Sequence, residues 1–295
     1  MASDSKNKNW LGYAAYFVVS TVILFYFLFP ADFMEGLLNS SVSRINPELT
    51  FKAEKIRPWI PAGLRVESGQ IYLGNTPEVA VFKSDNFYIA PHILKLVKGE
   101  YSADLEGNAY KGDISGTLHF AAADKEIASE IIFRDFALGE YDFLAEKFKH
   151  GVTGSLSGEI IYSNESAGTA GGSGSIDLRL SDGRLQFKAP VFNIASLDLQ
   201  SIKLEAKFIR RDITIVKAEL QGSEVNGSMT GSIKLQKDIR QSQLNLRGTL
   251  EPLAQFYQNY PEIRELLKTM KKRVKRGQYF FTVTGTLGDP RFKLL

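Results

Sequence analysis

The chain of 295 residues carries 36 basic and 33 acidic side chains, a net charge of +3 at pH 7, and no cysteine. This even balance argues against a nucleic-acid partner, which usually needs a basic excess on one face. Without cysteine, disulfides, thiolate metal sites and a cysteine nucleophile are excluded. The composition fits a bacterial envelope protein that core packing alone stabilises.

The first predicted element is a membrane-spanning helix from Trp10 to Phe29, twenty residues without a charged side chain. Twenty residues at about 1.5 Å rise match a hydrocarbon core of roughly 30 Å. The alternatives are a buried helix of a soluble core and a cleaved signal peptide, whose apolar region usually spans only about 7 to 15 residues. We expect an uncleaved anchor. Its expected membrane contacts are Trp10, Tyr13, Phe17, Ile23, Tyr26 and Phe29.

The charges that flank this segment predict its direction. Lys6 and Lys8 precede it, whereas Asp32 and Glu35 follow it. Positive residues remain on the cytoplasmic side. We therefore expect residues 1–9 to form a cytoplasmic tail and the chain after residue 29 to lie outside the cytoplasm.

A β-rich first half is predicted over residues 30–162. It begins with a short amphipathic continuation of the anchor, and Asn46-Pro47 predicts a break because the residue before proline disfavours the helical region. From Phe51 onward, short alternating runs are separated by glycine and proline, a pattern typical of strands. Residues 140–149 are a candidate short helix.

Residues 163–175, SNESAGTAGGSGS, are predicted to be a flexible loop because they are poor in apolar side chains. They form either a long hairpin loop or a boundary before a second β-rich half, residues 176–295. In that half, Asp182-Gly183 is a hairpin turn signal. The apolar positions change from odd at Leu199 to even at Ile202, which requires a bulge or bend near Gln200.

A helix is predicted at about residues 253–275, after Pro252, because apolar residues recur there at helical spacing. This segment also holds the most distinctive charged feature, a basic run. The run is either a solvated helix face whose cations favour the negative end of the helix dipole, or a contact for anionic headgroups or an acidic partner. Its members are Lys268, Lys271, Lys272, Arg273, Lys275 and Arg276.

One short pattern recurs through the predicted strands: apolar, any residue, glycine, serine or threonine, apolar. In each copy, glycine occupies a position where the alternation expects an apolar side chain, so it weakens the strand for a geometric reason. The glycines allow a long antiparallel sheet to coil, or they open an apolar trough for acyl chains. They are Gly116, Gly154, Gly231, Gly248 and Gly285.

Catalytic patterns are not found in the sequence. The three histidines, His92, His119 and His150, are widely spaced and have no ligand-spaced partner. The sequence contains neither a GxxxxGK[ST] phosphate loop nor a GxSxG nucleophile elbow. We expect a protein that is not an enzyme and that holds no metal or cofactor.

The N-terminal anchor and the strands that end in Gly-Thr-Leu or Gly-Ser-Ile are two parts of a wider resemblance. The others are the run LRLSDGRL at residues 178–185 and the closing TGTLGDPRF at residues 284–292. Together they resemble the GspN family, type II secretion system protein N, which in turn resembles AsmA-like envelope proteins.

The GspN resemblance implies an inner-membrane protein with a periplasmic β-rich body that assists export of folded proteins, with other type II secretion components as partners. The AsmA-like side implies instead a half-pipe sheet that handles phospholipid. The expected fold is mainly β: one N-terminal transmembrane helix, then a long, coiled antiparallel sheet, half-pipe or open barrel, with one or two short helices.

Overall fold

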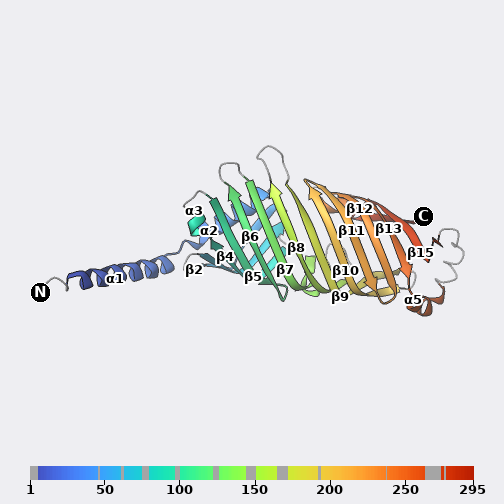
Figure 1. Ribbon diagram of the computed structural model, residues 1–295, viewed down its shortest axis with the longest axis horizontal. Coiled ribbons are helices and arrows are strands. Elements are labelled where there is room, and N and C mark those ends of the chain that lie inside the picture. The colour runs from blue at the N-terminus through green and yellow to red at the C-terminus, as the bar shows by residue number, and fades with distance from the viewer. Residues whose placement is uncertain are drawn as a thin grey trace. The chain divides into compact units, whose positions relative to one another are not determined.

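The structure is a computed structural model (Figure 1). It describes residues 6–45, 47–60, 63–74, 80–96, 100–121, 126–143, 151–164, 172–191, 194–236, 238–262, 274–275 and 277–295. Backbone pairing is antiparallel throughout, and the strand order is open rather than closed. The expected mainly β class with few helices is therefore confirmed.

The chain forms two compact units, Met1–Ala90 and Pro91–Leu295. The first unit holds α1 (Lys6–Phe27), α2 (Ala31–Ile45), β1 (Leu49–Lys52), β2 (Lys55–Trp59), β3 (Gly63–Leu73) and β4 (Ala80–Pro91), which ends at the boundary. The second unit begins with α3 (Ile93–Leu96), β5 (Glu100–Ala109), β6 (Gly112–Ala121), β7 (Glu126–Ala137), the 3-10 helix η1 (Leu138–Glu140) and β8 (Gly151–Asn164). It continues with β9 (Ser173–Val191), β10 (Ile194–Ile209), β11 (Asp212–Gly222), β12 (Val225–Lys234), η2 (Ile239–Gln241) and β13 (Gln243–Pro252). It ends with α5 (Ala254–Asn259), β14 (Val274–Lys275), β15 (Gln278–Thr286) and β16 (Asp289–Leu294).

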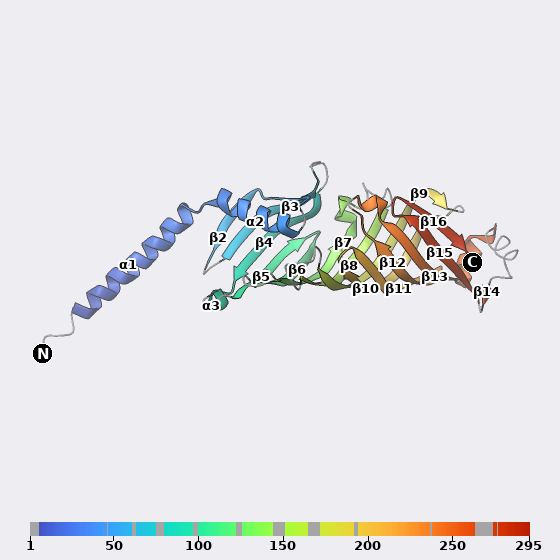
Figure 2. The ribbon, with the colours of Figure 1, turned by 90° about the horizontal axis from the view of Figure 1, so that it is seen from above.

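Strands pair mostly with their neighbours in sequence. In the first unit, β3 pairs with β1 and β2 along one side and with β4 along the other. In the second unit, β5 to β13 follow one another in order, and β15 pairs with β13, β14 and β16 (Figure 2). The alternation of the sequence explains this arrangement, because each strand turns apolar side chains to one face: in β13, Leu244 and Leu246 are buried whereas Asn245 is exposed.

The predicted apolar helix is present as α1, which ends shortly before Pro30. Its described aromatic side chains are strongly exposed: 71% for Trp10, 75% for Tyr13 and 71% for Phe17. Among the residues that the structure describes, no helix combines the length and the hydropathy that crossing a membrane requires. The next helix, α2, ends at Ile45, which confirms the break expected at Asn46-Pro47.

The bulge expected near Gln200 is confirmed, because the register of β10 against β11 shifts between Leu199 and Ser201. The hairpin turn expected at Asp182-Gly183 is wrong. β9 runs through this pair without a break, and Asp182 has a positive φ of 50° inside the strand. Aspartate tolerates this left-handed conformation, so the same dipeptide can form a bulge where strands continue to pair on both sides.

The Asp182-Gly183 bulge of β9 lies opposite Gly154 of β8, whose φ is 132°, and the register of these two strands shifts there. One further irregularity lies on the next strand. On β7, the register against β8 shifts at Asp135, whose φ is 56°. Two serines of β8 hold this shift: Asp135 N–H donates to Ser157 Oγ at 2.9 Å, and Ser155 Oγ donates to Asp135 Oδ1 at 3.1 Å. Because a bulge bends its strand and increases its twist, these irregularities bend the sheet along one line.

The helix predicted at residues 253–275 is wrong at its C-terminal end. Within the described part of this segment, α5 and residues 261–262 are helical, whereas Val274–Lys275 form β14, which pairs with Tyr279 and Gln278. Residues 263–273 lie outside the described part of the chain. Of the candidate helix at 140–149, residues 144–149 also lie outside; residues 142–143 are helical, and the 3-10 helix η1 ends at Glu140.

The predicted flexible loop at 163–175 is shorter than expected at both ends. β8 extends to Asn164, β9 begins at Ser173, and residues 165–171 lie outside the described chain. The two strands pair up to Ser163 and Ser173. The segment therefore connects neighbouring strands of the second unit, as a long hairpin connection does.

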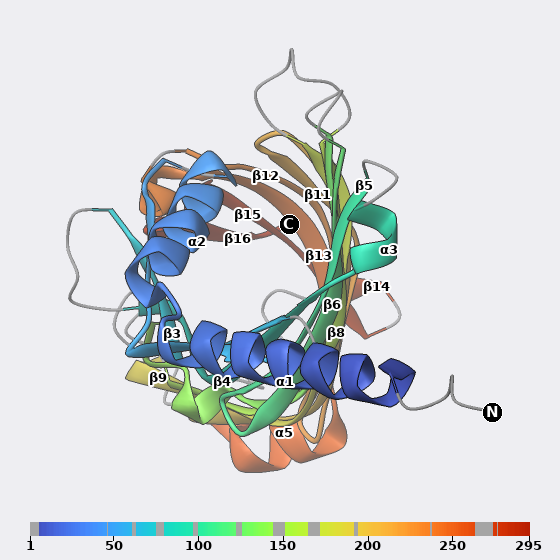
Figure 3. The same ribbon diagram turned by 90° about the vertical axis from the view of Figure 1, so that its left-hand side faces the viewer.

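Helix α2 lies along β1, at the edge of the first unit's sheet (Figure 3). Phe51 N–H donates to Asn39 Oδ1 at 2.9 Å, and Ala53 N–H donates to Glu35 Oε1 at 3.2 Å. Ser43 Oγ in turn donates to the carbonyl of Leu49 at 3.0 Å. Side chains of α2 thus bond edge groups that a further strand would otherwise bond, which protects this edge against pairing with another chain.

We predict that Asn39→Ala weakens this edge. The Phe51 amide would lose its acceptor, so the free energy of unfolding should fall by about 0.5 to 1.5 kcal/mol, and hydrogen exchange at Phe51 should accelerate. The control is Ser40→Ala, because Ser40 Oγ bonds only the Leu37 carbonyl of its own helix. Unchanged exchange at Phe51 in Asn39→Ala, measured on the full chain in detergent, would contradict the edge role.

Candidate functional site

The five glycines of the repeated pattern lie where neighbouring backbones approach closely. A Cβ atom added at any of them would lie within 3 Å of a carbonyl oxygen on the neighbouring strand. The distance would be 2.4 Å at Gly116, 2.9 Å at Gly154, 2.3 Å at both Gly231 and Gly248, and 2.7 Å at Gly285. Gly154, Gly231 and Gly285 also have positive φ angles. The close approach of the neighbouring backbone, together with the positive φ where it occurs, explains why glycine occupies these positions.

Large side chains of adjacent strands flank these glycines across the sheet. Gly231 lies between Ile215 and Leu246, and Gly248 lies between Met229 and Phe281. The ring of Phe281 covers Gly248 so closely that an added Cβ would lie 2.6 Å from Cζ. A ring over a glycine fills the space of the missing side chain. At Gly248 the contacts therefore favour close packing over an open gap.

The buried centre of this region is formed by Ile215, Leu244 and Leu246. Partly buried side chains pack around it: Leu204, Ala218, Met229, Ile233, Val283 and Leu287. Towards β8 and β9 the same face is less enclosed, with Ile160, Ile176 and Leu178 only half-buried. No described helix of the second unit is longer than the six residues of α5. Within the described chain, this apolar face therefore has no helical layer over it.

Helix α5 packs beside one part of the apolar face. Tyr279 pairs with Leu250, which lies on the same face of β13 as Leu246 and Gly248. Burial, with a hydrogen bond between the Tyr279 hydroxyl and that of Tyr257 of α5, raises the pKa of Tyr279 to about 12. Phe256 is buried, and its ring lies 5.2 Å from that of Tyr260. The hydrogen bond between Tyr257 and Tyr279 joins α5 to β15.

The predicted membrane contacts on α1 are exposed at Trp10, Tyr13, Phe17 and Tyr26, and the side chain of Ile23 lies outside the described set. Phe29 is half-buried. Together with Tyr26 it lines a cavity of about 300 Å³, which Ile56, Arg57 and Pro58 of β2 complete. The C-terminal end of α1 therefore lies beside Arg57.

The basic run is mostly outside the described chain: this holds for Lys268, Lys271, Lys272, Arg273 and Arg276. The remaining member, Lys275, lies in β14 opposite Gln278. Its position on a strand corrects the expected helical placement at this residue. Whether the run acts as a unit stays a prediction.

One described histidine, His92, has a carboxylate partner. His92 Nε2 lies 2.9 Å from Asp104 Oδ2, and Thr117 Oγ1 donates to Asp104 Oδ1 at 3.3 Å. The hydrogen bond from His92 lowers the pKa of Asp104. A nucleophile relay needs the histidine between hydroxyl and carboxylate, whereas here the carboxylate stands in the middle. His119 lies on β6 opposite Ser102, and His150 is outside the described residues.

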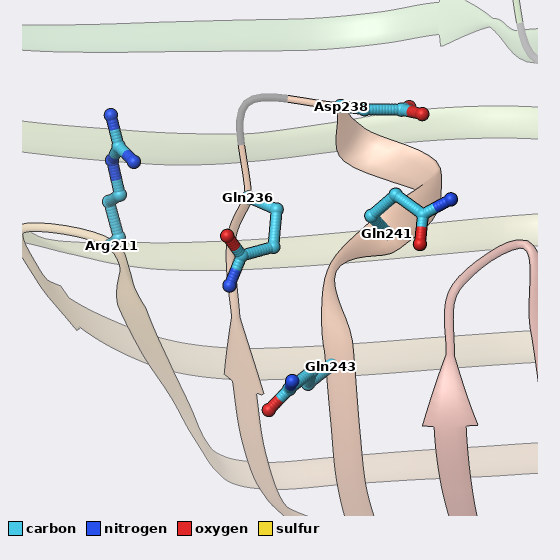
Figure 4. Close-up of a pocket in the computed structure, with 5 residues that line it drawn as sticks. All are labelled: Arg211, Gln236, Asp238, Gln241 and Gln243. Carbon is cyan, nitrogen blue, oxygen red and sulfur yellow. The ribbon is translucent and has the colours of Figure 1, made fainter.

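A second cavity, of about 600 Å³, lies at one end of the second unit's strands. Figure 4 shows its five labelled side chains: Arg211, Gln236, Asp238, Gln241 and Gln243. Asp238 is already engaged, because its Oδ1 accepts the Arg240 amide at 3.0 Å and caps η2. Small-molecule sites are usually apolar and enclosed with a few polar groups. This hollow is polar and its lining is exposed, so we assign it no ligand.

Sequence reasoning missed the two cavities and the edge contacts of α2. A signal for the smaller cavity was present in Arg57-Pro58-Trp59, a cation beside an aromatic shortly after the apolar segment. The contact of Asn39 with Phe51 had no such signal, because it joins residues 12 positions apart through tertiary packing. Within the described chain, no three His, Asp or Glu side chains are placed to hold a metal ion.

We predict that Gly248→Ala destabilises the full chain by about 1 to 3 kcal/mol, because the new methyl group would overlap Ser228 O and the Phe281 ring. Urea unfolding in detergent measures this. The matched control is Gly36→Ala in α2, where nothing lies within 4 Å of the added Cβ. Alanine there should stabilise by about 0.5 to 1 kcal/mol. Equal unfolding midpoints for the two variants would refute the close-approach explanation.

Comparison of this chain with protein-family models, with curated proteins and with solved structures finds no match. The resemblance to the GspN family therefore rests on the short motifs quoted above. Any function must be argued from those motifs together with the geometry of the described residues.

Proposed function

We propose that this protein is a non-enzymatic component of a type II secretion system. In this proposal α1 enters the bacterial inner membrane as a single span, residues 1–9 are cytoplasmic, and the two β-rich units lie in the periplasm beside other secretion components. The exposed aromatic surface of α1 is the observation that carries membrane attachment, because a helix so apolar has no polar face to offer water. The GspN resemblance supports the choice of machine.

A positional role agrees with the rest of the structure. Asp104 is shared by a histidine and a threonine, an arrangement that orders a loop rather than activating a nucleophile. The antiparallel strands instead present extended faces, as assembly surfaces do. The basic run, Lys268 to Arg276, is the candidate contact for an acidic partner within the machine.

We expect deletion of the gene to reduce release of folded exoproteins into the medium, and the full chain to restore it. A chain with residues 10–27 exchanged for an unrelated single membrane span should restore secretion equally if α1 only positions the protein. A chain without residues 6–29 should fail although it accumulates. Secretion unaffected by the deletion would refute the proposal, and loss with the exchanged span would refute a purely positional α1.

The second candidate is a lipid-binding or lipid-transfer protein of the AsmA-like type, with the long sheet coiled into a half-pipe. One observation favours it: the half-buried apolar row over β8 and β9 has no described helix above it. Phospholipid acyl chains are the ligand that such a surface would take. The close packing at Gly248 favours the first proposal over an open trough there.

A pair of variants on adjacent residues tests the lipid proposal. Leu178 lies on the apolar face and is half-buried, whereas Arg179 is exposed on the opposite face. Leu178→Glu should lower the phospholipid that co-purifies with the full chain, measured by mass spectrometry after solvent extraction, because a carboxylate disfavours acyl chains. Arg179→Glu should leave it unchanged. Equal lipid content in both variants, with both folded by circular dichroism, would eliminate acyl binding at this face.

A further inference from the structure

A row of cationic and aromatic side chains crosses the first unit near the end of α1. Arg57 of β2 pairs with Arg65 of β3, which pairs with Tyr88 of β4. Residues paired across antiparallel strands have the same side-chain direction. Trp59 follows Arg57 on the same face of β2, and its ring lies 5.3 Å from that of Tyr88.

The pair Arg57 and Arg65 is unfavourable by itself, because like charges directly opposite destabilise a sheet. Arg65 is compensated: its Nη2 donates to Asn86 Oδ1 at 3.1 Å, and its Nε lies 3.5 Å from Glu67 Oε1. Its guanidinium also lies 5.5 Å from the Tyr88 ring centre. For Arg57, in contrast, no described carboxylate lies within ion-pair distance. An anion beside Arg57 would supply the missing charge.

The surroundings of Arg57 indicate which anion fits. Arg57 lines the cavity of about 300 Å³ together with Tyr26, in the last turn of α1, and Phe29, two residues after its end. Trp59 and Ile60 nearby are 41% and 64% exposed. Aromatic side chains of this kind settle at the membrane interface. A ligand with a negative head and apolar chains matches both parts of this surface.

We propose that Arg57 binds the phosphate of an anionic phospholipid whose acyl chains lie against Tyr26 and Phe29. The planar guanidinium suits phosphate because it donates two parallel hydrogen bonds. The inference rests on the proposed insertion of α1 in the membrane, which would bring β2 to the headgroup level. It adds to that function a site for one lipid class, distinct from the apolar face of the second unit.

Native mass spectrometry of the full chain in detergent, titrated with phosphatidylglycerol or phosphatidylcholine, tests the site. Wild type should bind phosphatidylglycerol more tightly than phosphatidylcholine. Arg57→Gln should weaken phosphatidylglycerol about fivefold, as expected for one cation near a lipid surface, and leave phosphatidylcholine unchanged. The matched control is Arg247→Gln, because Arg247 is an exposed residue of β13 in the second unit. Equal effects of the two variants, or no preference in wild type, would overturn the proposal.

Three further measurements separate the possible failures. Arg57→Gln should unfold at the wild-type urea concentration or slightly above it, since the change removes one of two facing charges; a less stable variant would contradict the charge argument. Inorganic phosphate bound at Arg57 without lipid preference would assign a free-ion site and overturn the lipid site.

Carbonate extraction of membranes reports attachment independently. Loss of the wild-type chain from the membrane pellet refutes the proposed anchor. An Arg57→Gln chain that stays in the pellet and has an unchanged lipid preference refutes only the headgroup site.

Discussion

Antiparallel backbone pairing between successive strands is the interaction on which the rest of this structure depends. From β6 to β12, each strand bonds the strand before it and the strand after it in sequence. Such a meander satisfies the peptide groups of its inner strands but leaves an edge where it begins. At the edge of the first unit's sheet, Asn39, Glu35 and Ser43 of α2 bond peptide groups of β1 and of Ala53 just after it. The position of α2, between the apolar helix and the first strand, follows from this need.

A sheet without a helical layer must make its compact packing within its own strands. The second unit does so by placing large side chains beside glycines on adjacent strands, as at Phe281 and Gly248, so that backbones approach closely. It also carries bulges at facing positions of β7 to β10, which bend the sheet along one line. Burial is concentrated around Leu244 and Leu246, and the face over β8 and β9 stays partly exposed.

Several features were predictable because they depend on residues close in sequence. The jump of apolar positions between Leu199 and Ile202 can be met only by an extra residue in the strand, and the bulge is there. Asp182-Gly183 was misread because a local signal for positive φ is common to a turn and a bulge. Pairing of β9 with strands on both sides decides between them. The stripe after Pro252 was similarly ambiguous, and Val274–Lys275 pair with β15 instead of ending a helix.

The sequence by itself determined the apolar N-terminal helix, the mainly β class and the alternation that gives each strand one apolar face, because these follow from hydrophobic period and turn residues. Only the tertiary structure decided what lies beside each residue. Strand register places Arg57 opposite Arg65, and helix packing places Asn39 beside Phe51. The tertiary structure also places the ring of Phe281 over Gly248. Such contacts join residues far apart in the chain, and no local pattern specifies them, since a shift of one residue in register would exchange every partner.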